Sequence, residues 1–292
     1  MTLKSRYLAR LEIDESSFEG DPTYDNLAKL TEAHVSKIPY DNLAQHGAVG
    51  GPVVLDEETI ANKLLERKRG GFCLELNGLF AELLIELGYG VVRVPSFVFA
   101  PDVSGFRDTA THIFLIVTVP EDQSRRMVDV GFGESPIHPL RYEMDTVQIT
   151  PEGMESRIML CGDDEVVLEW KKESEWAPRF KWQESDVLWK EGPMLGEFQY
   201  SLECVHRPES IFSQKLVVCL TTREKKISLS GRKFKVTAPR FGPDSKIAVK
   251  AISSEEEARK ILTDEFNIPY EETEGLDLRK STMAPVEIWE SM

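Results

Sequence analysis

Near residue 90 of this 292-residue chain, the hydrophobic pattern changes from the period of helices to the period of strands. Before that point, apolar residues recur three and four positions apart, which is the spacing of one helix face. After it, short runs rich in β-branched and aromatic residues are separated by turns rich in Gly, Pro and Asp, as strands are. A long series of such strands suggests an antiparallel barrel or sandwich, so we predict an α+β fold.

The pattern predicts these helices: 3–13, 24–38, one starting at Asp56 and one starting at Cys73. Asp56 suits an N-cap position because two glutamates follow it in the positively polarised first turn. The strands are predicted at 91–100, 112–119, 127–132, 157–161, 165–170 and 178–182, with a poorly patterned connector at 190–209.

The last part of the chain mixes strand patterns with one helix pattern. Strands are predicted at 215–221, 225–229, 233–236 and 247–251. Ser254 is followed three residues later by Glu257, which is the spacing of a capping box. Apolar residues then continue at helical spacing as far as Phe266, so we predict a helix that starts at Ser254.

A cysteine opens the fourth predicted helix. It lies within the block Arg-Gly-Gly-Phe-Cys-Leu-Glu-Leu-Asn-Gly-Leu-Phe, residues 69–80, and the leucines that follow mark one apolar face. A thiol in the first turn of a helix faces unpaired backbone N–H groups and the positive end of the helix dipole, which favour the nucleophilic thiolate. The alternative is that Cys73 is a small buried hydrophobe, as most free cysteines are.

Two further residues give the cysteine a chemical context. His112 is the first residue of a predicted buried strand, where side chains at the sheet rim can reach a site. Asp129 lies in the next strand between two valines, so its side chain points to the opposite face. A buried carboxylate needs a partner, and we predict that Asp129 holds one imidazole nitrogen while the other faces the thiol.

These blocks resemble arylamine N-acetyltransferases in their order and separation. The resemblance extends over about residues 5–240 and rests on RGGFCLELNGLF, THIFLIV at 111–117 and VDVGFG at 128–133, with YLAR at 7–10, IPYDNL at 38–43 and FSQK at 212–215 in support. It implies an α+β fold that contains a helical bundle, an antiparallel β-barrel and an α/β lid, with a papain-like cysteine triad. It also implies a role in xenobiotic metabolism.

The resemblance assigns roles to the three parts of the chain. Residues 1–90 would form the helical bundle that carries the nucleophile, residues 91–210 the barrel with His and Asp plus the connector, and residues 211–292 the lid. The implied catalytic residues are Cys73, His112 and Asp129. Positions that match the acceptor pocket of the family are Tyr40, Phe72, Val98 and Phe132, for which ordinary core packing is the other interpretation.

The family uses an acyl-CoA as cosubstrate, and this chain must bind that polyanion despite a net charge of −15. Backbone N–H groups in the turn at Gly131 and Gly133 are one expected means, since such turns can bind anions. The other is a basic segment, unless its side chains are only solvated strand-face charges: Arg223, Lys225, Lys226, Arg232, Lys233 and Lys235.

The implied reaction moves an acyl group, most simply acetyl, from acyl-CoA to an arylamine, hydrazine or arylhydroxylamine through a thioester on Cys73. Propionyl-CoA and malonyl-CoA stay open as donors. A cysteine hydrolase or transglutaminase-like enzyme could use the same triad, and a non-catalytic binding module is the third interpretation. We expect no permanently bound cofactor and no metal, because the Cys and His spacings match no zinc pattern.

Composition sets limits on partners and location. The acidic balance argues against nucleic acid as a partner. The sequence contains no apolar run of membrane-spanning length and no apolar leader at its start. Four cysteines without a CxxC motif do not suggest a disulfide framework, so we expect a cytoplasmic protein. The oligomeric state is left open.

A few side chains near these blocks carry smaller expectations. We expect Arg69 to tie the cysteine loop to Asp41 or Asn42. His34 and His206 lie in polar sequence and are expected at the surface. His138 is expected to be a loop residue without a catalytic role, and the remaining cysteines to be inert: Cys161, Cys204 and Cys219.

Overall fold

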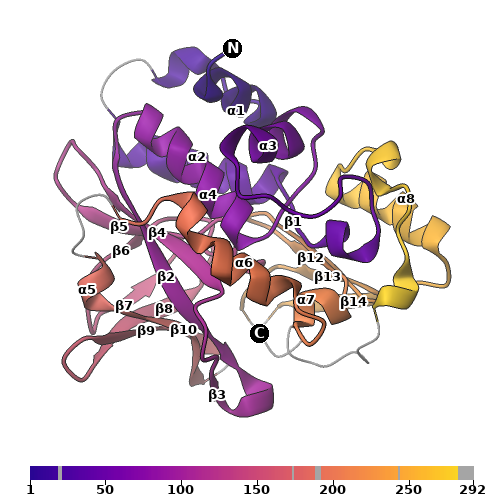
Figure 1. Cartoon of the computed structure of the whole chain (residues 1–292). Coiled ribbons are helices and arrows are strands. Elements are labelled where there is room, and N and C mark those ends of the chain that lie inside the picture. The colour runs from indigo at the N-terminus through magenta and orange to yellow at the C-terminus, as the bar shows by residue number, and fades with distance from the viewer. Residues whose placement is uncertain (19–21, 173, 188–191, 243, 282–292) are drawn as a thin grey trace.

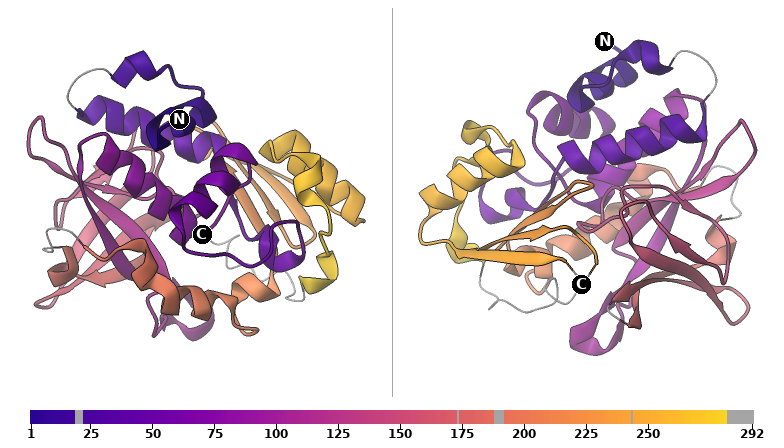
Figure 2. Two further views of the ribbon diagram at one scale, coloured as in Figure 1. Left: turned by 45° about the horizontal axis from the view of Figure 1, so that its top comes forward. Right: turned by 180° about the vertical axis from the view of Figure 1, so that it is seen from behind.

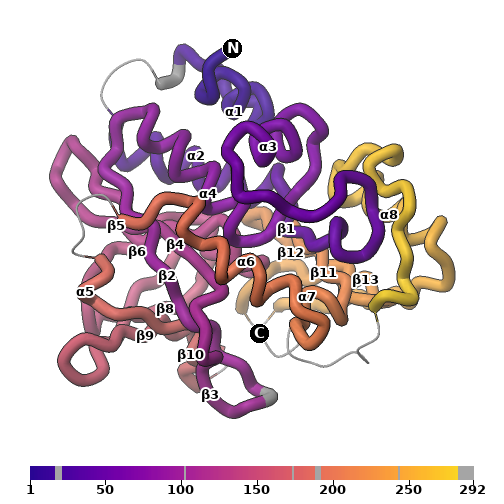
Figure 3. The backbone as a smooth tube through the Cα atoms, in the orientation of Figure 1, coloured from indigo at the N-terminus to yellow at the C-terminus, as the bar shows by residue number. Residues whose placement is uncertain are grey.

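The structure, a computed structural model, describes residues 1–18, 22–172, 174–187, 192–242 and 244–281. Its N-terminal helices lie over two antiparallel sheets (Figure 1). The colours of Figure 3 follow the chain from the indigo helices through the magenta barrel strands to the orange and yellow last sheet and its helix. The predicted α+β fold, with an almost closed antiparallel barrel, is confirmed.

The N-terminal helices agree with the predicted ones to within a few residues. They are α1 (Leu3–Leu11), α2 (Tyr24–Lys37), α3 (Glu57–Ala61) and α4 (Cys73–Glu86). Asp56 caps α3 as expected, because its carboxylate accepts the N–H of Thr59 at 2.9 Å. Directly after α3 the chain makes a π-helical turn at Asn62–Glu66.

Helix α4 is more deeply buried than a helix with one apolar face. Every side chain from Cys73 to Ala81 is buried, including the polar Glu75 and Asn77. A helix buried on all sides lies inside a core rather than on its surface. Gly88 follows the helix with a φ of +91°, the left-handed conformation expected at a helix end.

The barrel is built from short antiparallel strands around an aromatic interior. These are β2 (Gly90–Ala100), β3 (Gly105–Phe106), β4 (His112–Thr118), β5 (Arg125–Val128), β6 (Leu140–Arg141), β7 (Val147–Ile149), β8 (Glu155–Cys161), β9 (Glu165–Lys172) and β10 (Glu175–Gln183). Their order is β6-β5-β4-β2-β10-β9-β8-β7, with β3 paired to β2. A short helix, α5 (Glu184–Val187), follows β10.

A side chain joins the two end strands of this order. The amide of Gln148 in β7 accepts the backbone N–H of Arg141 in β6 at 2.7 Å and donates to the carbonyl of the same residue at 2.8 Å. The amide therefore makes the pair of hydrogen bonds that a neighbouring strand would make. It covers an edge that would otherwise present unpaired backbone groups.

The second sheet has the order β1-β11-β12-β13-β14. It contains β1 (Tyr40–Asp41), β11 (Val217–Thr221), β12 (Lys226–Ser230), β13 (Lys233–Ala238) and β14 (Lys246–Ala251). Helix α8 (Glu255–Phe266) covers its outer side (Figure 2) and begins at the predicted cap, where Ser254 accepts the N–H of Glu257. Because β1 comes from the N-terminal part, the first and last parts of the chain share a sheet.

The connector predicted over 190–209 contains a helix that we did not predict, α6 (Gln199–His206). Leu195, Phe198, Leu202 and Val205 are spaced at helical intervals, and all four are buried. The helical spacing was therefore present in the sequence, but the pattern is short and interrupted by polar residues. A further short helix, α7 (Ile211–Gln214), precedes β11.

Strand β4 lies between two cores, which explains why its sequence is apolar throughout. Ile113, Leu115 and Val117 belong to the core around α4. Phe114 and Ile116 belong to the interior of the barrel. A strand buried on both faces reads as a continuous apolar run. Its first residue thus lies where the helices meet the barrel.

Candidate active site

Cys73 is the first residue of α4, and the loop before it is held against β1. Gly70 donates its N–H to the Asp41 carboxylate at 2.9 Å, and a Cβ on Gly70 would lie only 2.0 Å from the Pro39 carbonyl oxygen. Only glycine allows this approach. The Cys73 side chain is 3% exposed, and its Sγ lies 3.4 Å from the carbonyl oxygen of Thr111. The thiol therefore lies next to the residue that precedes His112.

His112 and Asp129 form the predicted pair. Nε2 of His112 lies 2.8 Å from Oδ2 of Asp129, and both side chains are buried. The prediction that Asp129 lies inside a strand is wrong, because β5 ends at Val128. The two valines that flank Asp129 belong to the core around α4. With Nε2 engaged, Nδ1 is the remaining ring nitrogen for the thiol.

A residue that we did not single out, Asn77, holds the aspartate to the cysteine helix. Its Nδ2 donates to Oδ1 of Asp129 at 2.9 Å and to the Ile113 carbonyl at 2.7 Å, while its Oδ1 accepts the N–H of Val130 at 2.9 Å. Asn77 lies four residues after Cys73, so both side chains lie on the same face of α4. The sequence offered one indication of this role, because Asn77 is a polar residue within an apolar helix face.

The environment of His112 favours its charged form. Burial lowers the pKa of the imidazole, but the charge and hydrogen bond of Asp129 and the interaction with Cys73 outweigh it and raise the pKa to about 9. An imidazolium at neutral pH can stabilise a neighbouring thiolate. The rings of Phe132 and Phe180 each lie 4.9 Å from the imidazole and limit the access of water to it.

The turn after Asp129 packs directly against the cysteine. A Cβ on Gly131 would lie 2.7 Å from Cα of Cys73, so this position requires glycine. The N–H of Gly131 donates to Oδ1 of Asp129 at 2.9 Å, which removes it as the anion donor that we expected. Gly133 has a φ of +76° and lies beside the Tyr40 ring.

The four residues expected at the acceptor pocket occupy two places. Tyr40 and Phe72 are buried, and both rings contact Phe212, at 6.4 and 6.1 Å between centroids. Phe132 lies against His112, whereas the half-buried Val98 is paired in register with Phe180 across β2 and β10. Tyr40, Phe72 and Phe132 therefore adjoin the loop of Cys73 or the ring of His112, whereas Val98 pairs with Phe180, which contacts that ring.

The structure also places the arginine and two of the histidines for which the sequence raised expectations. Arg69 contacts Asp41 at 3.5 Å, as predicted. His34 is fully buried and hydrogen-bonded to the hydroxyl of Tyr7 at 2.8 Å, so its expected surface position is wrong. The polar residues around it in sequence lie on the other face of α2. His138 pairs with Glu152 at 3.0 Å, away from Cys73.

Comparisons with known proteins agree with this geometry. A family model described as N-acetyltransferase matches residues 23–274. The chain belongs to the arylamine N-acetyltransferase family. It is 34% identical to the arylamine N-acetyltransferase of Mycobacterium tuberculosis over 229 residues, which are 75% of this chain and 76% of the relative.

Two further relatives describe what members of the family do. One from Salmonella typhimurium, named an arylamine N-acetyltransferase and N-hydroxyarylamine O-acetyltransferase, is 32% identical over 68% of this chain and 67% of its own. The structure of the Mycobacterium marinum arylamine N-acetyltransferase in complex with CoA has a TM-score of 0.80 and 29% identity, covering 96% of this chain and 99% of that one. This chain is accordingly an acyltransferase.

A cationic cleft of about 400 Å³ lies between the barrel and the second sheet of this arylamine N-acetyltransferase. Its charged lining comes from Lys171, Lys172, Arg179, Lys226, Lys235, Arg240 and Glu134. Of the basic segment expected to meet CoA, only Lys226 and Lys235 are among the described lining residues. Arg223 instead pairs with Glu32 at 2.7 Å.

Arg179 is the unusual residue of this cleft. A β-bulge between Pro178 and Phe180 leaves Arg179 without a partner in the ladder, and a bulge re-aims the side chain of its extra residue. The guanidinium lies 4.2 Å from the ring centre of Trp170 and 5.3 Å from that of Phe132. It is buried, and within the described residues its Nε and Nη2 have no hydrogen-bond partner. Burial lowers its pKa to about 10.

Within 1–18, 22–172, 174–187, 192–242 and 244–281, no three His, Cys, Asp or Glu side chains are placed to hold a metal ion. In the same ranges, no helix has the length and apolar character that crossing a membrane requires.

Proposed function

We propose that this acyltransferase works by two half-reactions through a thioester on Cys73. His112 takes the thiol proton at Nδ1, while Asp129 holds Nε2 at 2.8 Å. The thiolate attacks the carbonyl carbon of acetyl-CoA, and N–H groups in the first turn of α4 stabilise the oxyanion. The carbon–sulfur bond to CoA breaks, CoA leaves as the thiol after taking the proton from His112, and Cys73 stays acetylated.

In the second half-reaction, a neutral acceptor amine attacks the Cys73 thioester. His112 accepts the proton that the attacking N–H or O–H group loses, the bond to Sγ breaks, and the acetylated acceptor leaves. We propose arylamines, hydrazines and arylhydroxylamines as acceptors, and the name of the Salmonella relative supports the last class. The apolar rings of Tyr40, Phe72 and Phe132 would hold the flat acceptor and exclude water, which would otherwise hydrolyse the thioester.

We propose further that the cationic cleft receives the phosphates of CoA. Two buried guanidiniums support this, because a buried charge with unsatisfied N–H groups is costly unless a ligand completes it. Arg179 offers Nε and Nη2, and Nη1 of Arg240 makes no hydrogen bond within the described residues, although Glu152 lies 3.8 Å away. Phe132 lies between Arg179 and His112, so the cleft adjoins the reaction centre.

The single observation that carries the proposed mechanism is the buried His112–Asp129 pair beside a cysteine that opens a helix. Mass spectrometry of the intact protein after incubation with acetyl-, propionyl- and malonyl-CoA tests it. Wild type should gain one acyl group and Cys73→Ala none, since alanine suits the first turn of a helix and leaves the fold intact. An adduct that persists on Cys73→Ala would assign the nucleophile elsewhere.

A further inference from the structure

We propose that Lys63 is a positioning residue for Cys73, and that it acts through Glu75 from a pocket on the far side of the cysteine loop. The inference rests on the proposed role of Cys73 as the nucleophile. Lys63 lies in the π-helical turn after α3, and π-helical turns occur frequently at functional sites.

Lys63 holds the cysteine loop at both of its ends. Its backbone carbonyl accepts the N–H of Arg69 at 3.0 Å, at the start of the loop. Its Nζ donates to both carboxylate oxygens of Glu75, at 2.6 and 2.9 Å. Glu75 in turn accepts the N–H of Phe72, the residue directly before Cys73, at 3.3 Å. One residue therefore restrains both sides of the turn that presents the thiol.

Glu75 needs this cation because it has almost no contact with water. Its side chain is 1% exposed, and burial raises its pKa while the charge and hydrogen bond of Lys63 oppose the shift. The carboxylate also lies tightly against the loop, because a Cβ on Gly71 would come within 2.8 Å of Oε2. Without Lys63, a buried carboxylate would lose its counter-ion two residues from the nucleophile.

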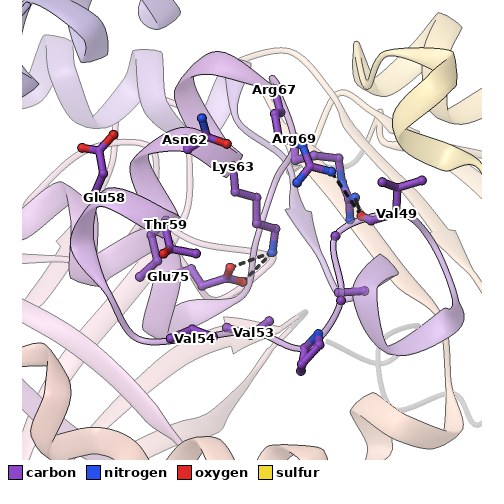
Figure 4. A pocket seen from close by; sticks show the side chains of 15 residues that line it. Val49, Val53, Val54, Glu58, Thr59, Asn62, Lys63, Arg67, Arg69 and Glu75 are labelled. Atoms are coloured by element: carbon purple, nitrogen blue, oxygen red, sulfur yellow. Dashed lines mark hydrogen bonds and ion pairs between the residues drawn. The ribbon is translucent and has the colours of Figure 1, made fainter.

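The Lys63–Glu75 pair is reached through a pocket of about 350 Å³ (Figure 4). The pocket is bordered by the loop that contains Val49 and Val53, by the π-helical turn and by the first turn of α4. Lys63 extends across it toward Glu75. Since the Lys63 side chain is still 15% exposed, a small cation from solvent can occupy its place once that side chain is removed.

The test measures the rate at which iodoacetamide alkylates Cys73 at neutral pH, followed by the mass of the peptide that contains Cys73, because the exposed Cys161 also reacts. Lys63→Ala should slow alkylation about tenfold, as expected when a hydrogen bond to a buried charge is lost. Added butylammonium, but not sodium chloride of equal ionic strength, should restore most of the rate. Lys250→Ala is the control, because Lys250 of β14 and Glu257 of α8 form an ion pair of 2.7 Å that is more exposed and not part of the cysteine loop.

Two more variants separate positioning from general loss of structure. Lys63→Arg should keep most of the wild-type rate. Lys63→Met combined with Glu75→Gln should recover much of the rate lost in Lys63→Ala, because no charge is left buried and the amide oxygen can still accept the Phe72 N–H.

A folded Lys63→Ala protein that alkylates at the wild-type rate would overturn the proposal. So would a slowing that neither butylammonium nor the Glu75→Gln background relieves. Alkylation is read at the thiol itself, without any acyl donor. The result is therefore distinct from a failure of the proposed acyl transfer, which the Cys73→Ala mass measurement reports.

Discussion

The polar groups around Asp129 and those in the cationic cleft are both buried, but they differ in how completely they are satisfied. The Asp129 carboxylate accepts hydrogen bonds from Asn77 and Gly131 and pairs with His112. Arg179, on the other side of Phe132, has two N–H-bearing atoms without a partner among the described residues. The first arrangement is satisfied by the protein's own groups, whereas two donor atoms of the second are not. This difference fits the proposed roles, in which the first organises the reaction and the second receives a phosphate.

The largest effect is expected from Asp129→Asn. The amide keeps the shape of the side chain but favours the wrong tautomer of His112 and weakens the imidazolium. We expect acylation of Cys73 to fall by about 10³- to 10⁴-fold, as in other triads. The loss should be equal for every acceptor amine, because it arises before an acceptor binds. Stopped-flow CoA release, with thermal melts alongside, measures it. A folded variant that acylates normally would leave only a Cys73–His112 dyad.

Asn77→Ala tests whether the satisfied network acts as one unit. It leaves the aspartate without one donor, and it leaves the N–H of Val130 and the carbonyl of Ile113 without their partner. Unsatisfied buried groups cost about 1–3 kcal/mol each, so the variant should melt at a lower temperature and acylate about tenfold to a hundredfold more slowly. Calorimetry and CoA release check both effects. An unchanged acylation rate would show that Asp129 is fixed by Gly131 and His112 alone.

Arg179→Met should have the opposite effect on stability. We expect KM for acetyl-CoA to rise about tenfold, because one charge-assisted hydrogen bond to a phosphate is lost. KM for acetyl-pantetheine, which carries no phosphate, should not change. The free protein should melt at a higher temperature, since a buried charge without a hydrogen-bonded partner has been removed. Arg223→Ala, at an exposed ion pair outside the cleft, is the control and should leave both KM values unchanged.

If Arg179→Met lowers the melting temperature and leaves KM for acetyl-CoA unchanged, its guanidinium is a packing residue held by Trp170 and Phe132. The cleft would then not be the site of the phosphates. This outcome would remove the contrast between the two buried regions.

The smallest expected effect is a change in the free energy of unfolding with pH. The pKa of His112 is raised from an ordinary value of 6.5 to about 9 in the folded protein. Its contribution to the free energy of unfolding is therefore complete below pH 6.5 and is lost as pH rises through about 9. Urea unfolding across this range should show a decline in wild type that is reduced in His112→Gln. Equal declines in the two proteins would mean that other groups set the pH dependence.

The sequence was sufficient for features that depend on local pattern. The period of the apolar residues located α4 and β4, and the position of Cys73, His112 and Asp129 in those patterns anticipated their approach. Features that depend on packing between elements were not predictable. Pro178 in a central strand is typical of a bulge, but the sequence Pro-Arg-Phe does not show that Arg179 turns inward toward Trp170 and Phe132. The burial of His34 likewise depends on Tyr7 from another helix.

The fold also engages groups that the sequence left free for anion binding. In sequence, the N–H of Gly131 was a free donor in a glycine turn, but in the fold the neighbouring carboxylate takes it. The basic segment was one cluster in sequence, but in the fold Lys226 and Lys235 line the cleft, whereas Arg223, in the turn before β12, pairs with Glu32.

Strand β4 connects catalysis to the cooperativity of folding. Its odd-numbered side chains complete the core around α4, and its even-numbered ones complete the interior of the barrel. Neither core can melt without removing part of the other, so the two should unfold together in a single transition. His112 is part of this strand, and the cysteine helix packs on one of its faces. Partial unfolding therefore cannot leave an active fragment, and residual acyltransfer during denaturation should report the fraction of fully folded molecules.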